Sequence, residues 1–449
     1  MTGPLAGRVF DVPANGVSGD HAAATLIDFG AEVRRHPARP GTTALADWAG
    51  SGVLWLTGPA DAPPIVGAGA PASATRGALL AVDQLARRRL GHGVALPDPR
   101  LLGERAALAA RRRNAPWSVG GSFRAIACAA GWVGVSLARP SDLAALPAAL
   151  ERREIDDPWH ELSAWAAGQA APDVAERLQL LGIAAAVVAA DPGYPVDDQA
   201  RHRNRPVRWT HPANRHRASV GRPPLVVDLT SLWAGPLCGS LLAAAGATVI
   251  KVESATRPDG ARVGDPALFD RLHRGQRLVS LDFTTTAGRD ALRRLIESAD
   301  LVLEASRPRA MQQLGVDPTA VVDGGTSWLS ITAYGRSGPW SNRIGFGDDV
   351  AAAAGLVAWT DAGPVPVGDA IADPLAGVHA AAVAAAVLMD PDHAWLADVS
   401  MRDVAAAAAR LPCEPAAVVA ADQGWEVVVD GARIPVSPAA ATRDGIGAR

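Results

Sequence analysis

Short apolar runs alternate along this chain with amphipathic stretches, and that alternation predicts strands separated by helices. Near the beginning, residues 8–12 predict a buried strand, residues 20–29 a helix, and the run from residue 30 a second strand. A strand–helix–strand opening is typical of a parallel α/β sheet. The second half continues the alternation, and we expect its strands and helices at residues 225–229, 236–245, 246–252, 277–283, 286–298, 300–304, 310–314, 327–334 and 395–400.

The middle of the chain has a different pattern. Residues 120–136 predict a β-hairpin. Three amphipathic helices and a strand are expected after it, at residues 141–153, 158–169, 172–181 and 184–188. These elements form an α+β unit of their own. Residues 201–222 are rich in Arg, His and Pro without interleaved aromatic pairs, which indicates an extended connector and gives little support to nucleic-acid binding.

Two stretches of the chain resemble each other at long range. The strand–helix–strand pattern of residues 8–33 returns at residues 225–252, and the run from Ala72 to Gly77 resembles the run from Ala372 to Gly377, 300 positions later. We interpret this as an internal duplication whose first copy lost part of its middle. The first copy carries Ser73 where the second carries Asp373.

The predicted organisation has three parts. Residues 1–113 form a truncated, degenerate copy of a large domain, residues 114–216 a small α+β domain, and residues 217–449 the complete large domain. The last part ends in a predicted hairpin at residues 427–435, where Asp430 and Gly431 make the turn.

Composition limits the class of protein. A chain of 449 residues with 49% hydrophobic and 20% charged residues is an ordinary globular protein of two or three domains. A net charge of −3 gives no general attraction to nucleic acid or anionic membrane. The three cysteines lie far apart, so we expect neither disulfides nor a metal site. The first residues lack the apolar core of a signal peptide and no apolar run is long enough to span a bilayer, so a cytoplasmic location is expected.

Asp373 is the strongest candidate for chemistry. It precedes Pro374 and an alanine-rich run, which predicts a helix with Asp373 as N-cap and Pro374 as first residue. A carboxylate at the positive end of a helix dipole is favoured in its ionised form and can serve as a nucleophile. Many Asp-Pro pairs at helix starts are only caps, so the residues alone leave both roles open.

The second half resembles the class III coenzyme A transferases, the CaiB/BaiF family, in a series of motifs that follow one another in order. These motifs are residues 228–236, 246–253, 272–277, 304–308, 334–339 and 371–377. The resemblance implies a Rossmann-like parallel sheet in the large domain. Residues 114–216 resemble the family's small domain, with Gly120 and Gly121 at the place of its glycine-rich loop. Since family members form interlocked dimers, the resemblance implies a homodimer or an intramolecular pseudo-dimer.

The resemblance also implies a reaction. The aspartate that matches Asp373 attacks the thioester of an acyl-CoA, and coenzyme A is passed to a carboxylic acid through covalent intermediates on that aspartate. Acyl-CoA and carboxylic acid are then the small-molecule substrates, and neither a metal nor a permanently bound cofactor is implied. The implied coenzyme A contacts are Trp233, Ala234, Leu272, His273, Arg274, Gly275, Ala305, Ser306, Arg307, Gly345, Phe346 and Gly347.

Several positions depart from the family pattern. Ala305 and Ser306 replace the usual Asn-Phe pair, and Ser254 stands where an arginine is common. Arg274 and Arg307 are still suited to phosphate groups. The loop at residues 120–121 is poorer in glycine than the family version, so its role as donor of N–H groups to an oxyanion is less well supported.

Three alternatives remain. The α-methylacyl-CoA racemase branch of the same fold pairs the aspartate with a histidine, but Phe346 occupies that position here and cannot exchange protons. His379 lies further into the predicted helix and reads as a core or surface histidine. Ser73 in the degenerate copy suggests a non-catalytic coenzyme A-binding or scaffold protein, against which Asp373 is retained. A nicotinamide-dependent dehydrogenase is disfavoured because no Gly-x-Gly-x-x-Gly follows either first strand.

Overall fold

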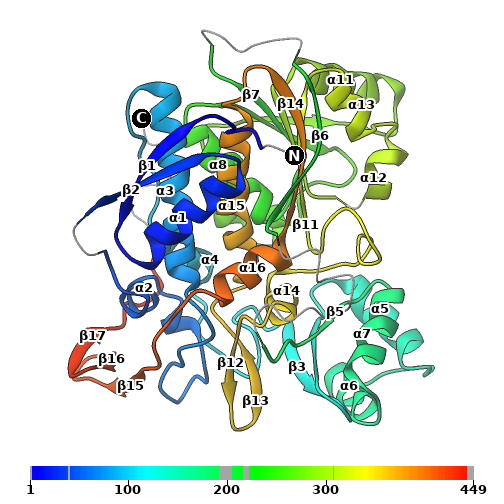
Figure 1. The fold of residues 1–449 in the computed structure, drawn as a ribbon. Helices are drawn as coiled ribbons and strands as arrows, with labels where there is room; N and C mark the ends of the chain where they lie inside the picture. The colour runs from blue at the N-terminus through cyan, green and yellow to red at the C-terminus, as the bar shows by residue number, and fades with distance from the viewer. Residues whose placement is uncertain (1–2, 39–40, 192–204, 216–221, 307, 442–449) are drawn as a thin grey trace.

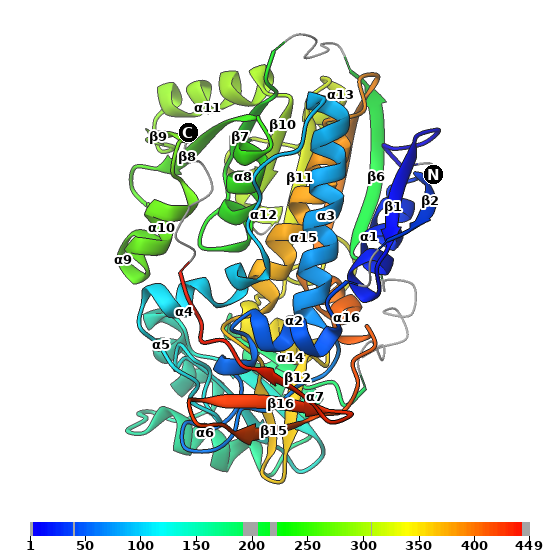
Figure 2. The ribbon, with the colours of Figure 1, turned by 90° about the vertical axis from the view of Figure 1, so that its left-hand side faces the viewer.

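A seven-stranded sheet forms the centre of the molecule in the computed structural model, which describes residues 3–38, 41–191, 205–215, 222–306 and 308–441. The strand order is β6-β14-β11-β10-β7-β8-β9 (Figures 1 and 2). Six strands are parallel and β6 is antiparallel to β14. The parallel strands therefore follow the order 3-2-1-4-5-6 of Rossmann folds. Their bounds are β7 Leu225–Asp228, β8 Thr248–Ser254, β9 Arg277–Leu281, β10 Leu301–Glu304, β11 Ser327–Thr332 and β14 His393–Ser400. The predicted parallel α/β sheet is confirmed.

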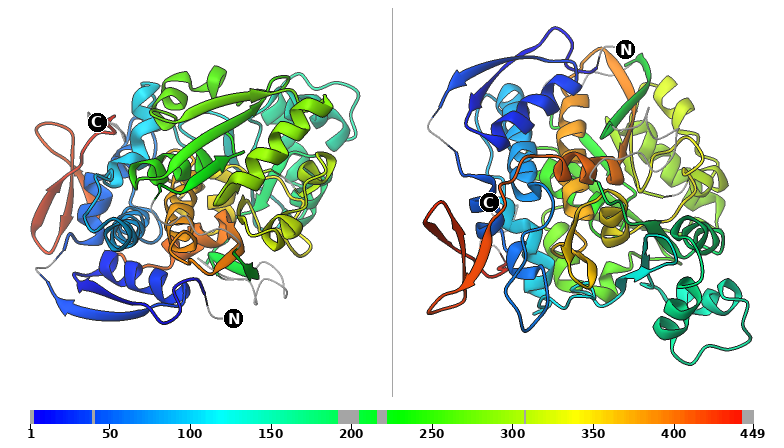
Figure 3. Two further views of the ribbon diagram at one scale, coloured as in Figure 1. Left: turned by 90° about the horizontal axis from the view of Figure 1, so that it is seen from above. Right: turned by 60° about the horizontal axis from the view of Figure 1, so that its bottom comes forward.

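Helices cover both faces of this sheet. One face carries α11 (Thr286–Ser298), α12 (Pro308–Gln313) and α13 (Pro318–Asp323), and the other carries α8 (Ala234–Ala244) and α15 (Ala372–Val387) (Figures 1 and 3). Helix α11 begins where predicted, because the Thr285 hydroxyl accepts the Gly288 N–H at 3.1 Å. Its buried side chains Leu292 and Ile296 then pack on the sheet.

Helix α15 is enclosed by helices on two sides. It packs against α8 and against α3 (Pro71–Leu90), and α1 (Val17–Asp28) packs on α3 in turn (Figure 2). Small side chains permit this close approach. A Cβ atom at Gly377 would lie 2.6 Å from the Ala234 carbonyl oxygen, so only glycine fits where α15 crosses the start of α8.

The N-terminal strands lie apart from the main sheet. Strands β1 (Val9–Ala14) and β2 (Glu32–Pro37) pair in parallel, with α1 between them in the chain. The predicted strand–helix–strand unit is therefore present, as a two-stranded sheet. The chain continues through short elements to the middle unit: α2 (Ala44–Gly50), the 3-10 turns at Leu54–Leu56 and Pro99–Gly103, and α4 (Glu104–Leu108).

The middle unit has an apolar core of its own. Strands β3 (Phe123–Ala127), β4 (Trp132–Ser136) and β5 (Ala184–Val187) form an antiparallel sheet. Buried Val133, Leu146, Leu162 and Leu178 belong to that core. The predicted hairpin is confirmed. The predicted helices are α5 (Pro140–Ala149), α6 (Pro158–Ala166) and α7 (Ala171–Leu180).

The prediction of a connector at residues 201–222 is wrong in part. Residues Val207–Asn214 form β6, which pairs with β14 and makes the antiparallel edge of the main sheet. Pro212 is compatible with a strand at an edge, where one side needs no ladder hydrogen bonds. Residues 192–204 and 216–221 of the predicted connector lie outside the described residues.

Several short elements were not anticipated. They are α9 (Ala261–Gly264), α10 (Pro266–Leu272), α14 (Gly347–Ala353), the hairpin of β12 (Val357–Thr360) and β13 (Gly363–Pro366), α16 (Met401–Ala409) and β15 (Ala417–Ala420). The predicted terminal hairpin is present as β16 (Trp425–Val429) and β17 (Ala432–Pro435). Its turn residues Asp430 and Gly431 both have positive φ, at 47° and 79°. Among the described helices, none has the length and apolarity needed to cross a bilayer.

Candidate active site

Asp373 lies in the first turn of α15. The helix begins at Ala372 with Ile371 as N-cap, so the prediction that Asp373 is the cap is wrong by two positions. The Asp373 N–H already donates to the Ala370 carbonyl at 2.9 Å, which places this residue inside the turn. Its carboxylate therefore does not cap its own helix and remains available to other groups.

The carboxylate faces the first residue of α14. The backbone N–H of Gly347 interacts with it and lowers its pKa. A Cβ atom at position 347 would lie 2.6 Å from Oδ2 of Asp373 and 2.2 Å from the Ala370 carbonyl oxygen. Only glycine allows the two chain segments to approach this closely.

The loop before α15 is held in an unusual backbone conformation. Gly368 and Ala370 have φ values of 62° and 43°. The Gly368 N–H donates to the Thr57 hydroxyl and the Ala370 N–H to the Asp348 carboxylate, both at 3.0 Å. A left-handed alanine costs roughly 1 kcal/mol, and such strain persists where surrounding contacts fix it, often at functional sites.

An arginine from the N-terminal region enters this site. Arg105 of α4 binds the buried Asp369 with two hydrogen bonds, Nη2 to Oδ1 at 2.5 Å and Nε to Oδ2 at 2.9 Å. Its guanidinium lies 4.8 Å from the ring centre of Trp233, one of the predicted coenzyme A contacts. Sequence reasoning missed Arg105 and Asp369. Nothing local distinguishes this arginine, since its partner is 264 residues away.

Burial dominates the electrostatics of Asp373. It raises the pKa of this carboxyl to about 6, against the lowering effects of Arg105 and Gly347, and Asp369 adds a smaller rise. The expectation that the helix start would favour the ionised form is therefore wrong in sign, because desolvation outweighs the local dipoles. At pH 7 the ionised form still exceeds the protonated form by about tenfold.

Two further carboxyl groups lie at the start of α14. Burial raises the pKa of Asp348 and of Asp349 to about 7 each. Asp349 accepts the Ser136 hydroxyl at 2.7 Å and the Phe346 N–H at 2.9 Å. Since Ser136 belongs to β4, this buried contact joins the middle unit to the element that faces Asp373.

The predicted coenzyme A contacts meet in part at the switch point of the sheet. Strands β7 and β10 are neighbours from which the chain continues in opposite directions, and such a point opens a crevice at the strands' carboxyl ends. Trp233 and Ala234 follow β7, and Ala305 and Ser306 follow β10. The Ser306 hydroxyl donates to Glu304 at 2.5 Å. Arg307 lies outside the described residues.

The other predicted contacts differ in exposure. Leu272 and His273 are buried at the end of α10, whereas Arg274 and Gly275 are exposed in the loop that follows. Burial lowers the pKa of His273, and its Nε2 has no hydrogen-bond partner among the residues that the structure describes. Gly345 is packed tightly, since a Cβ atom there would lie 2.5 Å from Val350.

Residues expected to assist catalysis lie elsewhere. Gly120 and Gly121 form an exposed turn, in which the Gly121 N–H donates to the Ser118 carbonyl at 2.9 Å. Among the described residues no hydrogen bond joins this turn to Asp373, so its oxyanion role stays a prediction. His379 is buried beside Phe29 and His21, and burial lowers its pKa to about 3. The interpretation of His379 as a core residue agrees with this position.

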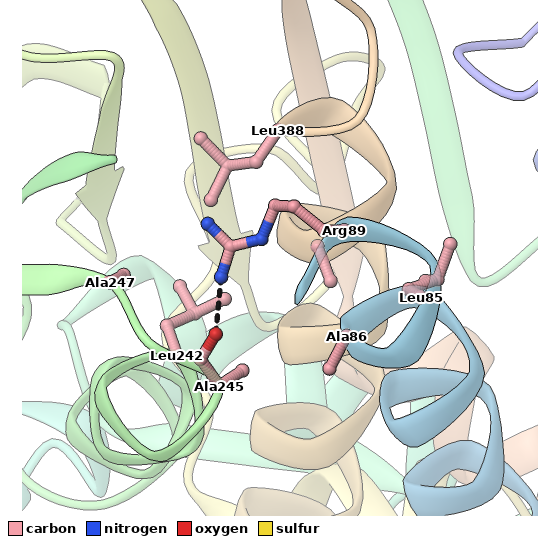
Figure 4. Close-up of a pocket in the computed structure, with 8 residues that line it drawn as sticks. Leu85, Ala86, Arg89, Leu242, Ala245, Ala247 and Leu388 are labelled. Carbon is pink, nitrogen blue, oxygen red and sulfur yellow. Dashed lines mark hydrogen bonds between the residues drawn. The ribbon is translucent and has the colours of Figure 1, made fainter. Parts of the chain in front are cut away.

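A small pocket lies at the opposite end of α15 from Asp373. It is lined by residues from the ends of α3, α8 and α15 (Figure 4). Arg89 reaches across it and donates to the Ala245 carbonyl at the end of α8. About 15 residues at 1.5 Å per residue separate Leu388 from Asp373, or about 22 Å, so the pocket is no part of this site.

Comparison with known proteins identifies the segment that carries the site. The family model for CoA-transferase family III matches residues 224–415. The succinyl-CoA–D-citramalate CoA-transferase of Chloroflexus aurantiacus is 33% identical over 168 residues, 35% of this chain and 42% of that protein. The succinate–glutarate CoA-transferase of Agrobacterium fabrum is 30% identical over 190 residues, 37% of this chain and 48% of that protein. The chain thus spans less than half the length of these two relatives.

The chain also aligns in part with solved protein structures. A hypothetical protein from Mycobacterium tuberculosis aligns over 47% of this chain and 66% of its own, at 30% identity and a TM-score of 0.42. A CAIB/BAIF family protein from Brucella suis aligns over 48% and 67%, at 25% identity and a TM-score of 0.40. The sequence comparisons confirm the predicted resemblance: residues 224–415 match the CoA-transferase family III model, and the chain is similar to named CoA-transferases over that segment.

Proposed function

We propose that the protein transfers coenzyme A from an acyl-CoA thioester to a carboxylic acid through a covalent intermediate on Asp373. The observation that carries this proposal is the placement of a part-exposed carboxylate against the Gly347 N–H within the family-matched segment. Relatives of this segment are named as a succinyl-CoA–D-citramalate CoA-transferase and a succinate–glutarate CoA-transferase. We extend that class of substrates, small carboxylic acids and their thioesters, to this chain.

The proposed reaction is a sequence of acyl exchanges. An Asp373 oxygen attacks the thioester carbonyl, the C–S bond breaks, and a mixed anhydride forms as coenzyme A leaves as thiolate. The thiolate then attacks the aspartyl carbonyl, which releases the donor carboxylate and leaves an aspartyl–CoA thioester. An acceptor carboxylate repeats the two steps in reverse order and regenerates Asp373. No proton is gained or lost overall, so the site needs a carboxylate rather than an acid–base pair.

Binding of coenzyme A is proposed at the carboxyl ends of β7 and β10, the switch point of the sheet. Trp233 lies over the Arg105 guanidinium there, and Ala234 starts α8. Exposed Arg274 is suited to phosphate groups. The roles of the other residues assigned by resemblance, and a cytoplasmic location, remain predictions from the sequence.

We further propose that the chain is a duplicated, trimmed pair of family units, with boundaries at residues 1–113, 114–216 and 217–449. The pairing of helices supports this idea. In the second copy α8 packs on α15, in the first α1 packs on α3, and α3 and α15 pack on each other (Figure 2). The middle unit, with its separate apolar core, corresponds to the small domain.

Racemisation is the weaker alternative. Phe346 lies at the N-cap of α14, where its ring is 5.3 Å from the Arg139 guanidinium. A phenylalanine cannot carry a proton, so 2-methylacyl-CoA in heavy water should not exchange its α-proton with this protein. Rapid deuterium uptake at that carbon would favour the racemase class instead.

The proposal is tested by trapping the intermediate. Wild type is incubated with succinyl-CoA or acetyl-CoA and then with hydroxylamine, which should convert Asp373 to a hydroxamate seen by mass spectrometry. Asp373→Asn and Asp373→Ala should fold and lose transfer by at least about a thousandfold, because neither side chain forms an anhydride. Ser73→Ala, at the matching position of α3, is the control that should keep activity. A folded Asp373→Ala variant with full transfer, or a hydroxamate on another peptide, contradicts the proposal.

A further inference from the structure

Arg105 connects three separate parts of the chain at the candidate active site. It belongs to α4, in the N-terminal region, yet it binds Asp369 four positions before Asp373 and stacks on Trp233 at the start of α8. The Asp369 carboxylate is fully buried and accepts two hydrogen bonds from Arg105. Asp369 lies in the loop that leads to the nucleophile. The family-matched segment, residues 224–415, does not contain Arg105.

We propose that Arg105 is a positioning residue of the Asp373 site, contributed by the N-terminal copy: it fixes the loop that leads into α15 and holds a positive charge beside the nucleophile. This inference rests on the proposed function of Asp373. It implies that the truncated copy, which lacks a nucleophile of its own, is retained because it completes the site of the other copy.

The geometry shows how Arg105 can act on the loop. Asp369 lies between Gly368 and Ala370, the two residues with positive φ. Two hydrogen bonds at 2.5 and 2.9 Å define the plane of the Asp369 carboxylate and so the orientation of this strained segment. Helix α4 is itself anchored, because Glu104 forms an ion pair with Arg271 of α10 at 2.7 Å. The arginine is therefore presented from a fixed support.

The charges around Asp373 show why a cation is needed there. Asp369, Asp348 and Asp373 are three carboxyl groups in one buried neighbourhood, and Arg105 is the cation that interacts with all three. Asp265 lies on its other side, 4.0 Å from Nη1, and is also paired with Arg111 at 3.1 Å. Without Arg105, an ionised Asp373 would face like charges with only the Gly347 N–H to offset them, and a larger fraction of the nucleophile would hold a proton at neutral pH.

The first test measures protonation of Asp373 without any substrate. Carbodiimide with an amine tags protonated carboxyl groups, and mass spectrometry follows the tag at Asp373 between pH 4.5 and 8.5. Wild type should show a midpoint near pH 6. Arg105→Met should move the midpoint up by about 1 unit or more, since an opposite charge at this range shifts a carboxyl by that amount. Asp369→Asn should move it down, because a neighbouring negative charge is removed.

The double variant separates charge from a loss of structure. Arg105→Met leaves a buried carboxylate without its partner and is expected to destabilise the protein. Arg105→Met/Asp369→Asn removes both charges, so it avoids that cost. Its midpoint should lie above that of Asp369→Asn alone. If Arg105 only supports packing, Arg105→Met and Asp369→Asn should not shift the midpoint of Asp373 protonation in opposite directions.

Arg76→Met is the matched control. Arg76 also binds a fully buried carboxylate, that of Asp47, at 2.7 Å, beside Ser73 at the start of α3. It should leave the Asp373 midpoint unchanged. The inference is overturned if Arg105→Met and the double variant leave the midpoint within about 0.3 units of their references, or if Arg76→Met shifts it equally.

Activity then separates this inference from the proposed function. Succinyl-CoA single-turnover labelling by Arg105→Met should fall by about twofold at pH 7 for a midpoint shift of about 1 unit, and recover at pH 8.5, as the fraction of ionised Asp373 rises. If Asp373→Asn retains full transfer, the proposed function fails while the protonation midpoints still stand. If Asp373 is essential but the midpoints do not move, only the role of Arg105 fails.

Discussion

The first turns of α3 and α15 are built from similar sequences and have opposite chemical character. At the start of α3, Ser73 donates to the Asp47 carboxylate at 2.7 Å. That same carboxylate also binds Thr42 and Arg76, so its lone pairs are occupied and its side chain is fully buried. At the start of α15, the carboxylate of Asp373 accepts the Gly347 backbone N–H and keeps part of its surface exposed.

The difference indicates how one framework can hold an inert site and a reactive one. A buried carboxylate that accepts several strong hydrogen bonds is stabilised and unreactive. Asp373 is buried enough for its pKa to rise, yet it receives few hydrogen bonds, which keeps its oxygens free for attack. The cation of each site is directed to a supporting aspartate, Asp47 or Asp369, and within the described residues Asp373 itself forms no direct ion pair.

Separating the two regions should have the largest effect. Residues 216–449 made alone should be insoluble or inactive, because α15 would lose α3 and the site would lose Arg105. Mixing with separately made residues 1–215 should restore transfer if the two parts associate. The measurement is succinyl-CoA-dependent labelling of Asp373. Full activity of the isolated 216–449 segment would show that the N-terminal region is dispensable.

Closing the space next to the nucleophile should have the next largest effect. In Gly347→Ala the new methyl group would meet the Ala370 carbonyl and Asp373 Oδ2 at 2.2 and 2.6 Å, so one segment must shift. A displacement near 1 Å lowers the rate of transfer by about a hundredfold. Gly50→Ala, at the end of α2 in the first region, meets no atom within 4 Å and is the control. Equal activity of the two variants would contradict a need for close approach.

Removing the charge of Asp373 should stabilise the protein. The folded pKa of about 6 exceeds the usual value of 3.8, so folding favours the protonated form and the ionised form is destabilising at neutral pH. Asp373→Asn should raise the free energy of unfolding by about 1–2 kcal/mol at pH 7.5, after discounting for partial exposure. The gain should disappear below about pH 4, where both states are protonated. Urea unfolding at the two pH values checks this, and a loss of stability at pH 7.5 would contradict it.

The smallest effect is expected at Ser73. Ser73→Ala removes one hydrogen bond to Asp47, which keeps Thr42 and Arg76, so the cost is about 1 kcal/mol. Transfer activity should not change. Urea unfolding and single-turnover labelling of one preparation test both statements. A strong loss of activity in a fully folded Ser73→Ala variant would mean that the first region also contributes chemistry.

The sequence predicted those features that depend on local patterns. Residues 286–298 coincide with α11 because a threonine cap precedes an amphipathic period. The Asp430–Gly431 turn followed from two residues that tolerate positive φ. Helix α14 was missed, since it is seven residues long, begins with glycine and is buried all round, so no period marks it.

The candidate site was predictable only in its central residue. Asp373 stood out through its motif, but its place within the turn and the direction of its pKa depended on burial, which no local pattern records. Arg105 could not be predicted at all, because its role comes from a contact across 264 residues. Strand β6 lies in the segment predicted to be a connector. It could not be predicted either, since its pairing with β14 spans nearly 190 residues.

The enclosure of α15 between α3 and α8 also sets an order of events during synthesis. Helix α3 ends at Leu90, and α15, which covers one of its faces, begins at Ala372. At 5–20 residues per second, the roughly 280 residues between them take about 14–56 s to emerge from the ribosome. Throughout that interval the face of α3 that α15 covers has no native partner. The protein should therefore depend on chaperones during translation, and slower synthesis before α15 should increase its aggregation.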